Sequence, residues 1–212
     1  MNQSTESNTT QNQPLLIEDI KLNMHGIHNV LNATATIALA SDLNVPLEVI
    51  KQALASFSGV QRRFTYVGDY SGVSIYDDYA HHPTEIAAVI AAAKKVTSGK
   101  LAVLVQPHRY TRLKEHFDDF VNTLTQCDYI GILPVYSAKE DPNGYDSERL
   151  LQRLLQVGCK NASLIKVEEV DDYIKSLTAS VLGTEKAPKI LVAMGAGDIS
   201  YIIRETVNKL IE

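Results

Sequence analysis

The sequence predicts an α/β fold with a doubly wound, mostly parallel six-stranded sheet that follows a short helical N-terminal segment. After residue 60, short apolar runs of strand length alternate with helical patterns of 10–15 residues. The runs are mainly apolar and do not alternate strictly between apolar and polar residues, as in strands that helices cover on both faces. Only the first two runs are close enough for a hairpin, so we expect the first strand to be antiparallel. Together these patterns are typical of a Rossmann-like domain.

Composition narrows the class of protein. The 212 residues are 45% hydrophobic and 21% charged, which excludes wholesale disorder and a coiled coil. The longest uncharged apolar stretches are about ten residues, too short to cross a bilayer, and no secretory signal opens the chain. The net charge of −5 argues against nucleic acid as a partner. The sequence has two cysteines, Cys127 and Cys159, which fits a reducing compartment, so we expect a cytoplasmic protein. Because the apolar stretches are short, we expect no membrane partner.

The N-terminal third divides into an arm and a helical segment. Residues 1–14 contain eleven Asn, Gln, Ser or Thr residues, so we interpret them as a disordered arm or an addition made in cloning. The loose alternation of 15–23 predicts one short strand. Helices are predicted over 28–41 and 46–57, and the pattern changes near 58.

From residue 59 onward the predicted elements form one domain, 59–212. Its six strands are predicted at 63–68, 73–78, 101–106, 129–134, 162–167 and 189–194, with a hairpin connection at 69–72. One helix begins at Pro83, and another carries Leu113, Phe117, Phe120 and Leu124. Ser147 is expected to cap the helix that follows the fourth strand.

Polar and aromatic residues follow four of these strands. They occupy 77–85, 107–112, 135–142 and 195–198, whereas the loops at the opposite edge of the predicted sheet have no such clusters of titratable and aromatic residues. Ligands of open parallel sheets bind outside the carboxyl ends of the strands. The sequence therefore predicts a binding site at this edge.

The acidic and histidine residues of these segments leave several interpretations open. The pair Asp77 and Asp78 could hold ribose hydroxyls or a magnesium ion, or cap the helix that begins at Pro83. Three histidines, His81, His82 and His108, could suggest zinc. No cysteine accompanies them and no ligand spacing fits, so we predict no metal ligand in the chain.

Two arginines follow the strand 101–106. Arg109 and Arg112 are three apart at the start of a helix, where they would share a face and bind a carboxylate or phosphate with help from the helix dipole. Surface salt bridges are the alternative.

Two further features precede the sheet. Asn29 and Asn32 share one face of the first predicted helix; Asn29 could be an N-cap, and both amides suit the edge of an adenine. The segment Gly59–Phe64 places Arg62 and Arg63 between the helical segment and the predicted sheet, where they could bind a phosphate. The glycine turn at 195–198 is not a dinucleotide fingerprint, and the sequence contains no phosphate-binding P-loop motif.

Five motifs resemble one family. The segments GIHNVLNATATIALA, GVQRRF, DDYAHHPTEI, QPHRYTR and MGAGDI occur in the order seen in the Mur ligases, from about residue 16 to the end. They are most similar to the branch that joins L-alanine to UDP-N-acetylmuramate in peptidoglycan biosynthesis. The related ligase that recycles murein tripeptide shares the first part of DDYAHHPTEI but resembles QPHRYTR poorly.

The resemblance implies a domain assignment. Mur ligases have three domains, and this sequence resembles the tail of the central ATPase domain (15–58) and the C-terminal Rossmann-like domain (59–212). Because the P-loop has no counterpart here, we expect part of a longer enzyme that is inactive alone. The alternatives are a stand-alone module that binds a nucleotide or a peptidoglycan precursor, the recycling ligase, and an oxidoreductase, which the missing fingerprint disfavours.

The resemblance also implies roles for individual residues. Its implied ligands are ATP and Mg, with UDP-N-acetylmuramate and L-alanine as the other substrates, and the Mg ligands would lie outside this chain. Asn29 and Asn32 match residues that contact adenine, Asp78 one that holds ribose, and Arg63 a catalytic arginine that reaches the phosphates. The residues that match the muramate and alanine side are Tyr79, His81, His82, His108, Arg109 and Arg112.

Overall fold

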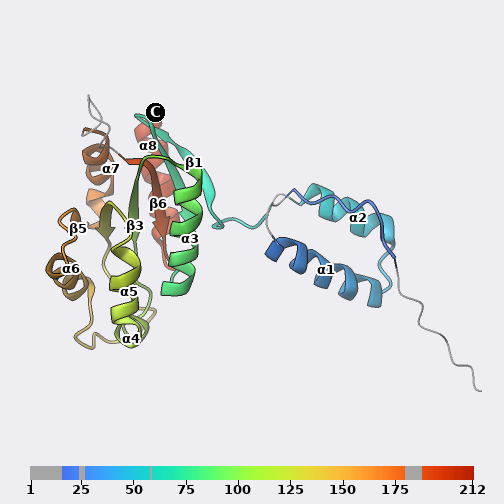
Figure 1. Ribbon diagram of the computed structural model, residues 1–212, viewed down its shortest axis with the longest axis horizontal. Coiled ribbons are helices and arrows are strands. Elements are labelled where there is room, and N and C mark those ends of the chain that lie inside the picture. The colour runs from blue at the N-terminus through green and yellow to red at the C-terminus, as the bar shows by residue number, and fades with distance from the viewer. Residues whose placement is uncertain (1–15, 24–26, 58, 180–187) are drawn as a thin grey trace, which may run out of the picture. The chain divides into compact units, whose positions relative to one another are not determined.

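A computed structural model describes residues 16–23, 27–57, 59–179 and 188–212 (Figure 1). The chain divides into two compact units, 1–60 and 61–212. The arm expected at 1–14 lies outside the described residues. Within the described residues, no helix is both long and apolar enough to cross a membrane.

The first unit contains two helices, α1 (Ile27–Asp42) and α2 (Leu47–Ser56). Pro46 precedes α2 with φ of −57°, as suits a helix start, and the Phe57 N–H donates to the Ala53 carbonyl at its end. The strand predicted over 15–23 is wrong for the described residues 16–23, which form no strand. Asp19 has φ of 62°, which interrupts an extended run.

The second unit contains the six-stranded sheet, in the order β1-β2-β6-β3-β4-β5. Its strands are β1 (Thr65–Tyr70), β2 (Val73–Asp78), β3 (Lys100–Val105), β4 (Tyr129–Ile132), β5 (Ala162–Leu164) and β6 (Pro188–Met194). Only β1 pairs antiparallel, through a two-residue turn in which Ser71 and Gly72 both have positive φ. The predicted doubly wound, mostly parallel sheet is confirmed.

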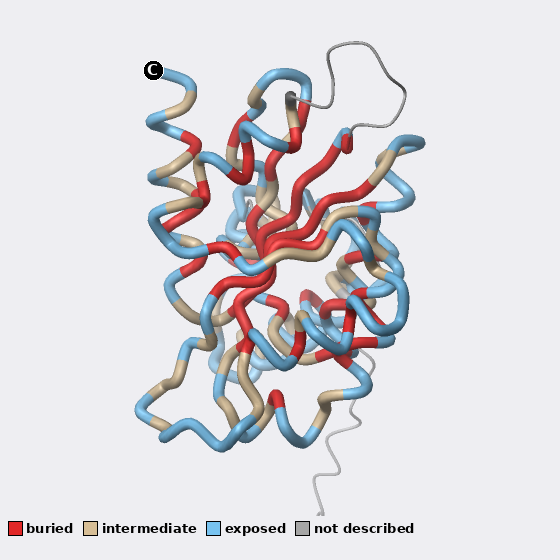
Figure 2. The backbone as a smooth tube through the Cα atoms, turned by 90° about the vertical axis from the view of Figure 1, so that its left-hand side faces the viewer, coloured by how far each residue is buried: buried red, intermediate tan, exposed pale blue. Residues whose placement is uncertain are grey.

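Helices cover both faces of the sheet (Figure 1). One face carries α3 (Pro83–Val96), α4 (Tyr110–Glu115), α5 (Phe117–Leu124) and α6 (Ser147–Gln156). The other carries α7 (Val170–Ala179), after the 3₁₀ turn Val167–Glu169, and α8 (Ile199–Ile211). Side chains alternate across the strands: Val103 packs with the first set of helices and Leu104 with the second. The central strands are accordingly the most deeply buried part of the domain (Figure 2).

Two details of the helices differ from prediction. The single helix expected over Leu113–Leu124 is two, because His116 leaves the helical region with φ of −116° and ψ of 26° between α4 and α5. Asp146, not Ser147, caps α6: its Oδ1 accepts the Arg149 N–H at 2.9 Å. The Ser147 hydroxyl instead donates to the Leu133 carbonyl at 2.7 Å, inside the core.

An ion pair between a buried aspartate and a partly exposed arginine fixes α8 against β2. Asp77 is fully buried, and its Oδ2 accepts the Ser200 hydroxyl at 2.6 Å. The same oxygen accepts Nε and Nη2 of Arg204 at 3.2 and 3.0 Å. These contacts join the last helix to the strand whose end opens on the candidate site.

Removing the partner of a buried charge should be costly. Arg204→Ala leaves Asp77 buried without its guanidinium, so we expect the free energy of unfolding to fall by about 3 kcal/mol. Lys175→Ala is the control, because the exposed pairs of Lys175 with Asp171 and Asp172 should contribute less than about 1 kcal/mol. Urea denaturation measures both, and equal losses would contradict this account of α8.

Candidate functional site

The loops after β2, β3, β4 and β6 meet at one edge of the sheet because these strands are parallel. β6 lies between β2 and β3, and its connection leads to α8, on the opposite face from α3 and α4. Loops that leave adjacent strands toward opposite faces open a crevice between them. The candidate site is this carboxyl edge.

Four rings form a continuous line along the edge, which we call the aromatic row: Tyr79, His81, His108 and Tyr136. Successive ring centroids are 5.2, 5.7 and 5.3 Å apart, and the last pair is stacked. The two tyrosines are each 39% exposed. The row therefore brings residues from three loops into one partly open surface.

The two histidines of the row present different hydrogen-bonding groups. His81 Nδ1 lies 2.9 Å from the Tyr79 carbonyl, so it donates, and Nε2 accepts in the neutral ring. His108 Nδ1 lies 3.2 Å from Arg112 Nη1, which can only donate. Neutral His108 therefore carries its proton on Nε2. When both rings are neutral, the row therefore offers one acceptor on His81 and one donor on His108.

Burial and neighbouring charges lower the pKa of His108. Desolvation contributes most, followed by the positive charge of Arg112, the His81 ring when it is protonated, and the positive charge of Arg109. Arg112 also donates from Nη1 to the His108 carbonyl at 3.0 Å, which fixes the ring relative to α4. At neutral pH, His108 is consequently a neutral hydrogen-bond donor.

His82 has a different position from its neighbour His81. It is the N-cap of α3, where Nδ1 accepts the Thr84 N–H at 3.3 Å and Glu85 completes a capping box. His82 Nε2 lies 3.2 Å from His116 Nε2. The structure therefore brings His81, but not His82, into the aromatic row, and a histidine rather than an aspartate caps α3.

The two arginines of QPHRYTR contact different partners. Arg112 contacts His108, whereas Arg109 lies 3.9 Å from Glu140 and has φ of 73°. Glu140 also accepts the backbone N–H and hydroxyl of Thr111 at 3.0 and 2.7 Å. The anion at the start of α4 is therefore a carboxylate of this chain, and these hydrogen bonds lower the pKa of Glu140.

Asp77 and Asp78 point to opposite faces of β2. Asp77 contacts α8, whereas Asp78 accepts the Phe64 N–H on Oδ2 and the Ala80 N–H on Oδ1, both at 2.7 Å. They cannot hold one magnesium ion together. In the described part of the chain, no group of three His, Cys, Asp or Glu residues is placed to hold a metal.

Asp78 is almost fully buried, at 4% exposure. Burial raises the pKa of its carboxyl, while its two backbone hydrogen bonds and the charge of Arg63 act in the opposite direction. Its two N–H bonds tie the segment before β1 to the loop after β2.

Arg62 and Arg63 point in different directions. Arg62 Nη2 donates to the carbonyls of Gly195 and Gly197, and its guanidinium carbon lies 4.6 Å above the centroid of the Tyr79 ring. Arg63 is exposed and forms no ion pair within 4.0 Å among the described residues. Arg62 thus extends the aromatic row to the glycine turn after β6.

The glycine turn is packed too tightly for a side chain. Gln106 is buried and bonds Asp198 Oδ1 at 2.6 Å and the Ile199 N–H at 3.2 Å. A Cβ on Gly197 would lie 2.5 Å from Gln106 Oε1 and 2.6 Å from the Tyr136 ring. A cavity of about 620 Å³ adjoins this turn, and its lining includes Gln106, Tyr136, Lys139 and Asp198.

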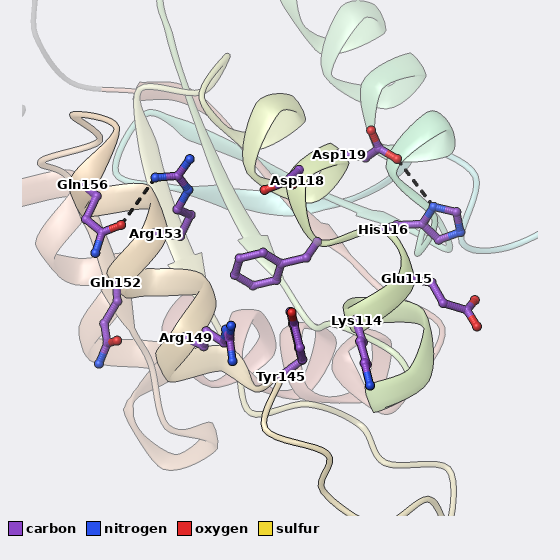
Figure 3. Close-up of a pocket in the computed structure, with 11 residues that line it drawn as sticks. Lys114, Glu115, His116, Asp118, Asp119, Tyr145, Arg149, Gln152, Arg153 and Gln156 are labelled. Carbon is purple, nitrogen blue, oxygen red and sulfur yellow. Dashed lines mark hydrogen bonds and ion pairs between the residues drawn. The ribbon is translucent and has the colours of Figure 1, made fainter.

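A second cavity, of about 590 Å³, lies between α4, α5 and α6, apart from the aromatic row. Figure 3 shows Arg149, Tyr145 and Lys114 side by side in it. The guanidinium of Arg149 stacks 4.0 Å from the Tyr145 centroid. No residue predicted for the candidate site lines this cavity.

Asn29 and Asn32 both lie within α1 of the first unit. Asn29 is inside the helix, so it is not an N-cap. Asn32 is exposed, and its carbonyl accepts the Thr36 hydroxyl at 2.9 Å.

Residues 62–197 match the family model described as Mur ligase, glutamate ligase domain. The chain is 44% identical over 185 residues to a UDP-N-acetylmuramate–L-alanine ligase of Azorhizobium caulinodans, covering 87% of this chain and 38% of that protein. The enzyme of the same name from Methylobacterium nodulans is 44% identical over 187 residues, covering 88% and 38%. The chain therefore spans less than half the length of these relatives.

Solved structures of related ligases are similar to this chain in fold. The UDP-N-acetylmuramate–alanine ligase of Thermotoga maritima matches 90% of this chain and 39% of its own, with a TM-score of 0.61 and 29% identity. A murein peptide ligase of Psychrobacter arcticus matches 90% and 38%, with a TM-score of 0.64 and 24% identity, and shows the same fold. This chain belongs to the Mur ligase family.

The protonation of His108 provides a direct test of the site's geometry. An NMR titration of the ring should give a pKa below the ordinary 6.5, and Arg112→Ala should raise it by removing a positive charge. A lowered pKa means that the contribution of His108 to stability is complete above about pH 6.5 and declines as the pH falls toward the folded-state pKa. His108→Gln should abolish that part of the pH dependence. A midpoint at or above 6.5 would exclude a desolvated His108 ring beside the Arg112 guanidinium.

Proposed function

We propose that this chain forms the C-terminal domain, with adjoining helices, of an ATP-dependent ligase that joins L-alanine to UDP-N-acetylmuramate in peptidoglycan biosynthesis. The observation that carries the proposal is the 44% identity over 185 residues to proteins of that name. The aromatic row at the carboxyl edge of the sheet supports it, since the family's motifs DDYAHHPTEI and QPHRYTR supply three of its four rings.

The proposed reaction has two steps. ATP transfers its terminal phosphoryl group to the muramoyl carboxylate, which gives an acyl phosphate and ADP. The amine of L-alanine then attacks the acyl carbon, the bond to the phosphate oxygen breaks, and an amide and inorganic phosphate result. Such chemistry needs positioned substrates and stabilised negative charge rather than a covalent protein nucleophile.

On the nucleotide side, Arg63 is proposed to contact the phosphates, Asp78 the ribose, and Asn29 and Asn32 the adenine. Arg63 suits this role because it is exposed and makes no close ion pair with a described carboxylate. Asp78 already accepts two N–H groups, but a carboxylate has about four lone pairs, so it retains capacity for a hydroxyl. Magnesium would neutralise phosphate charge when bound by residues outside this chain.

On the acceptor side, Tyr79, His81 and His108 are proposed to contact the muramate or alanine. The acceptor on His81 and the donor on His108 suit an amine and a carboxylate oxygen respectively. Arg109 and Arg112 are proposed to add positive charge for a carboxylate. His82 is proposed to act indirectly, through the start of α3.

The 212-residue chain alone should not catalyse ligation, because its sequence contains no P-loop motif to hold ATP. Phosphate release with ATP, magnesium, UDP-N-acetylmuramate and L-alanine should equal the background without enzyme. The complete ligase should release phosphate only when both acceptor substrates are present. Sustained turnover by the short chain would contradict the assignment, and dependence on a tripeptide instead of L-alanine would favour the recycling ligase.

Arg63→Ala in the complete ligase tests the phosphate contact. A contact that strengthens as charge develops should lower kcat by about tenfold or more while changing KM for ATP by less than about threefold. Arg153→Ala is the matched control, because Arg153 is an arginine of the other cavity that bonds Gln156. A change in KM alone would remove Arg63 from the catalytic step.

A further inference from the structure

The connection into the sheet has an unusual backbone. Within six residues, Gly59, Arg62 and Phe64 have φ of 96°, 63° and 47°. Arginine and phenylalanine rarely adopt positive φ, and such conformations persist only where surrounding contacts hold them. The contacts of Arg62 and Phe64 therefore hold this segment in its unusual backbone conformation.

Arg62 makes the most extensive of these contacts. Its Nη2 donates to the carbonyls of Gly195 and Gly197, and its guanidinium covers the Tyr79 ring at 4.6 Å. Its own carbonyl accepts the Tyr79 N–H at 2.8 Å. One residue thus joins the connection, the aromatic row and the glycine turn after β6.

The neighbouring contacts complete the arrangement. The Phe64 N–H donates to Asp78, and the Arg63 N–H lies 3.2 Å from the Thr65 hydroxyl. With Arg62 turned inward and Phe64 held by Asp78, the residue between them is directed outward, and Arg63 is indeed exposed.

We propose that Arg62 is a positioning residue that fixes the outward direction of Arg63 and the place of the Tyr79 ring. Its planar guanidinium donates to two carbonyls while it lies over the Tyr79 ring, whereas an ammonium group is not planar and cannot stack on a ring in this way. Lysine would keep the charge and lose the geometry. The consequence for catalysis rests on the proposed function, because it requires that Arg63 contacts the ATP phosphates.

The first test uses the 212-residue chain and needs no activity. In Arg62→Lys and Arg62→Ala, hydrogen exchange of the Tyr79 and Phe64 amides should accelerate at least about tenfold, while amides of β3 remain unchanged. Millimolar guanidinium should partly restore protection in Arg62→Ala. Arg149→Lys is the matched control, since Arg149 also stacks on a tyrosine and donates to a backbone carbonyl, that of Gly144.

Three results of this test would overturn the proposal. They are unchanged exchange at both amides, acceleration throughout the domain, and an equal effect of Arg149→Lys at Tyr79. The second of these would mean that Arg62 stabilises the fold in general rather than this segment.

The second test uses the complete ligase. Arg62→Lys should lower kcat by about the same factor as Arg63→Ala, with little change in KM for ATP, because a misdirected Arg63 and an absent one have the same consequence. If Arg63→Ala lowers kcat and Arg62→Lys does not, the positioning role is wrong. If neither variant changes kcat, the phosphate role of Arg63 fails, and the exchange measurement decides separately whether Arg62 fixes the segment.

Discussion

The buried carboxylate of Asp78 is the contact on which the candidate site depends. Its two oxygens accept the N–H groups of Phe64 and Ala80, so one side chain holds both the connection before β1 and the loop after β2. Because Asp78 is 4% exposed, these bonds are largely shielded from water, and leaving the charge unpaired would be expensive. The positions of Arg62, Arg63 and Tyr79 follow from this constraint.

Successive side chains of a β-strand point to opposite faces of the sheet, which explains why the adjacent residues Asp77 and Asp78 contact different parts of the domain. Asp77 points to α8 and secures the last helix through Arg204, whereas Asp78 points to the opposite face and organises the site. The same separation appears between His81, which joins the aromatic row, and His82, which caps α3. In each of these two pairs, one residue therefore faces the candidate site and its neighbour stabilises a helix.

The sequence predicted the sheet because burial on both faces leaves an apolar run at each strand, such as 101–106 for β3. It also located the edge where Tyr79, His81 and His108 gather, since parallel strands bring their ends together. It could not assign individual partners, which depend on contacts between distant segments. Examples are Glu140 at the start of α4, Gln106 under the glycine turn, and Arg62, which lies beside Arg63 in sequence yet faces the other way.

In the proposed function, this carboxyl edge, and not the cavity between α4, α5 and α6, is where the substrates of the complete ligase bind. Hydrogen exchange of the complete ligase, with and without a non-hydrolysable ATP analogue and UDP-N-acetylmuramate, tests it most directly. If the carboxyl edge binds the substrates, these ligands should protect amides at 62–64, 79–81 and 108–112. Protection confined to 145–156, around the other cavity, would contradict it.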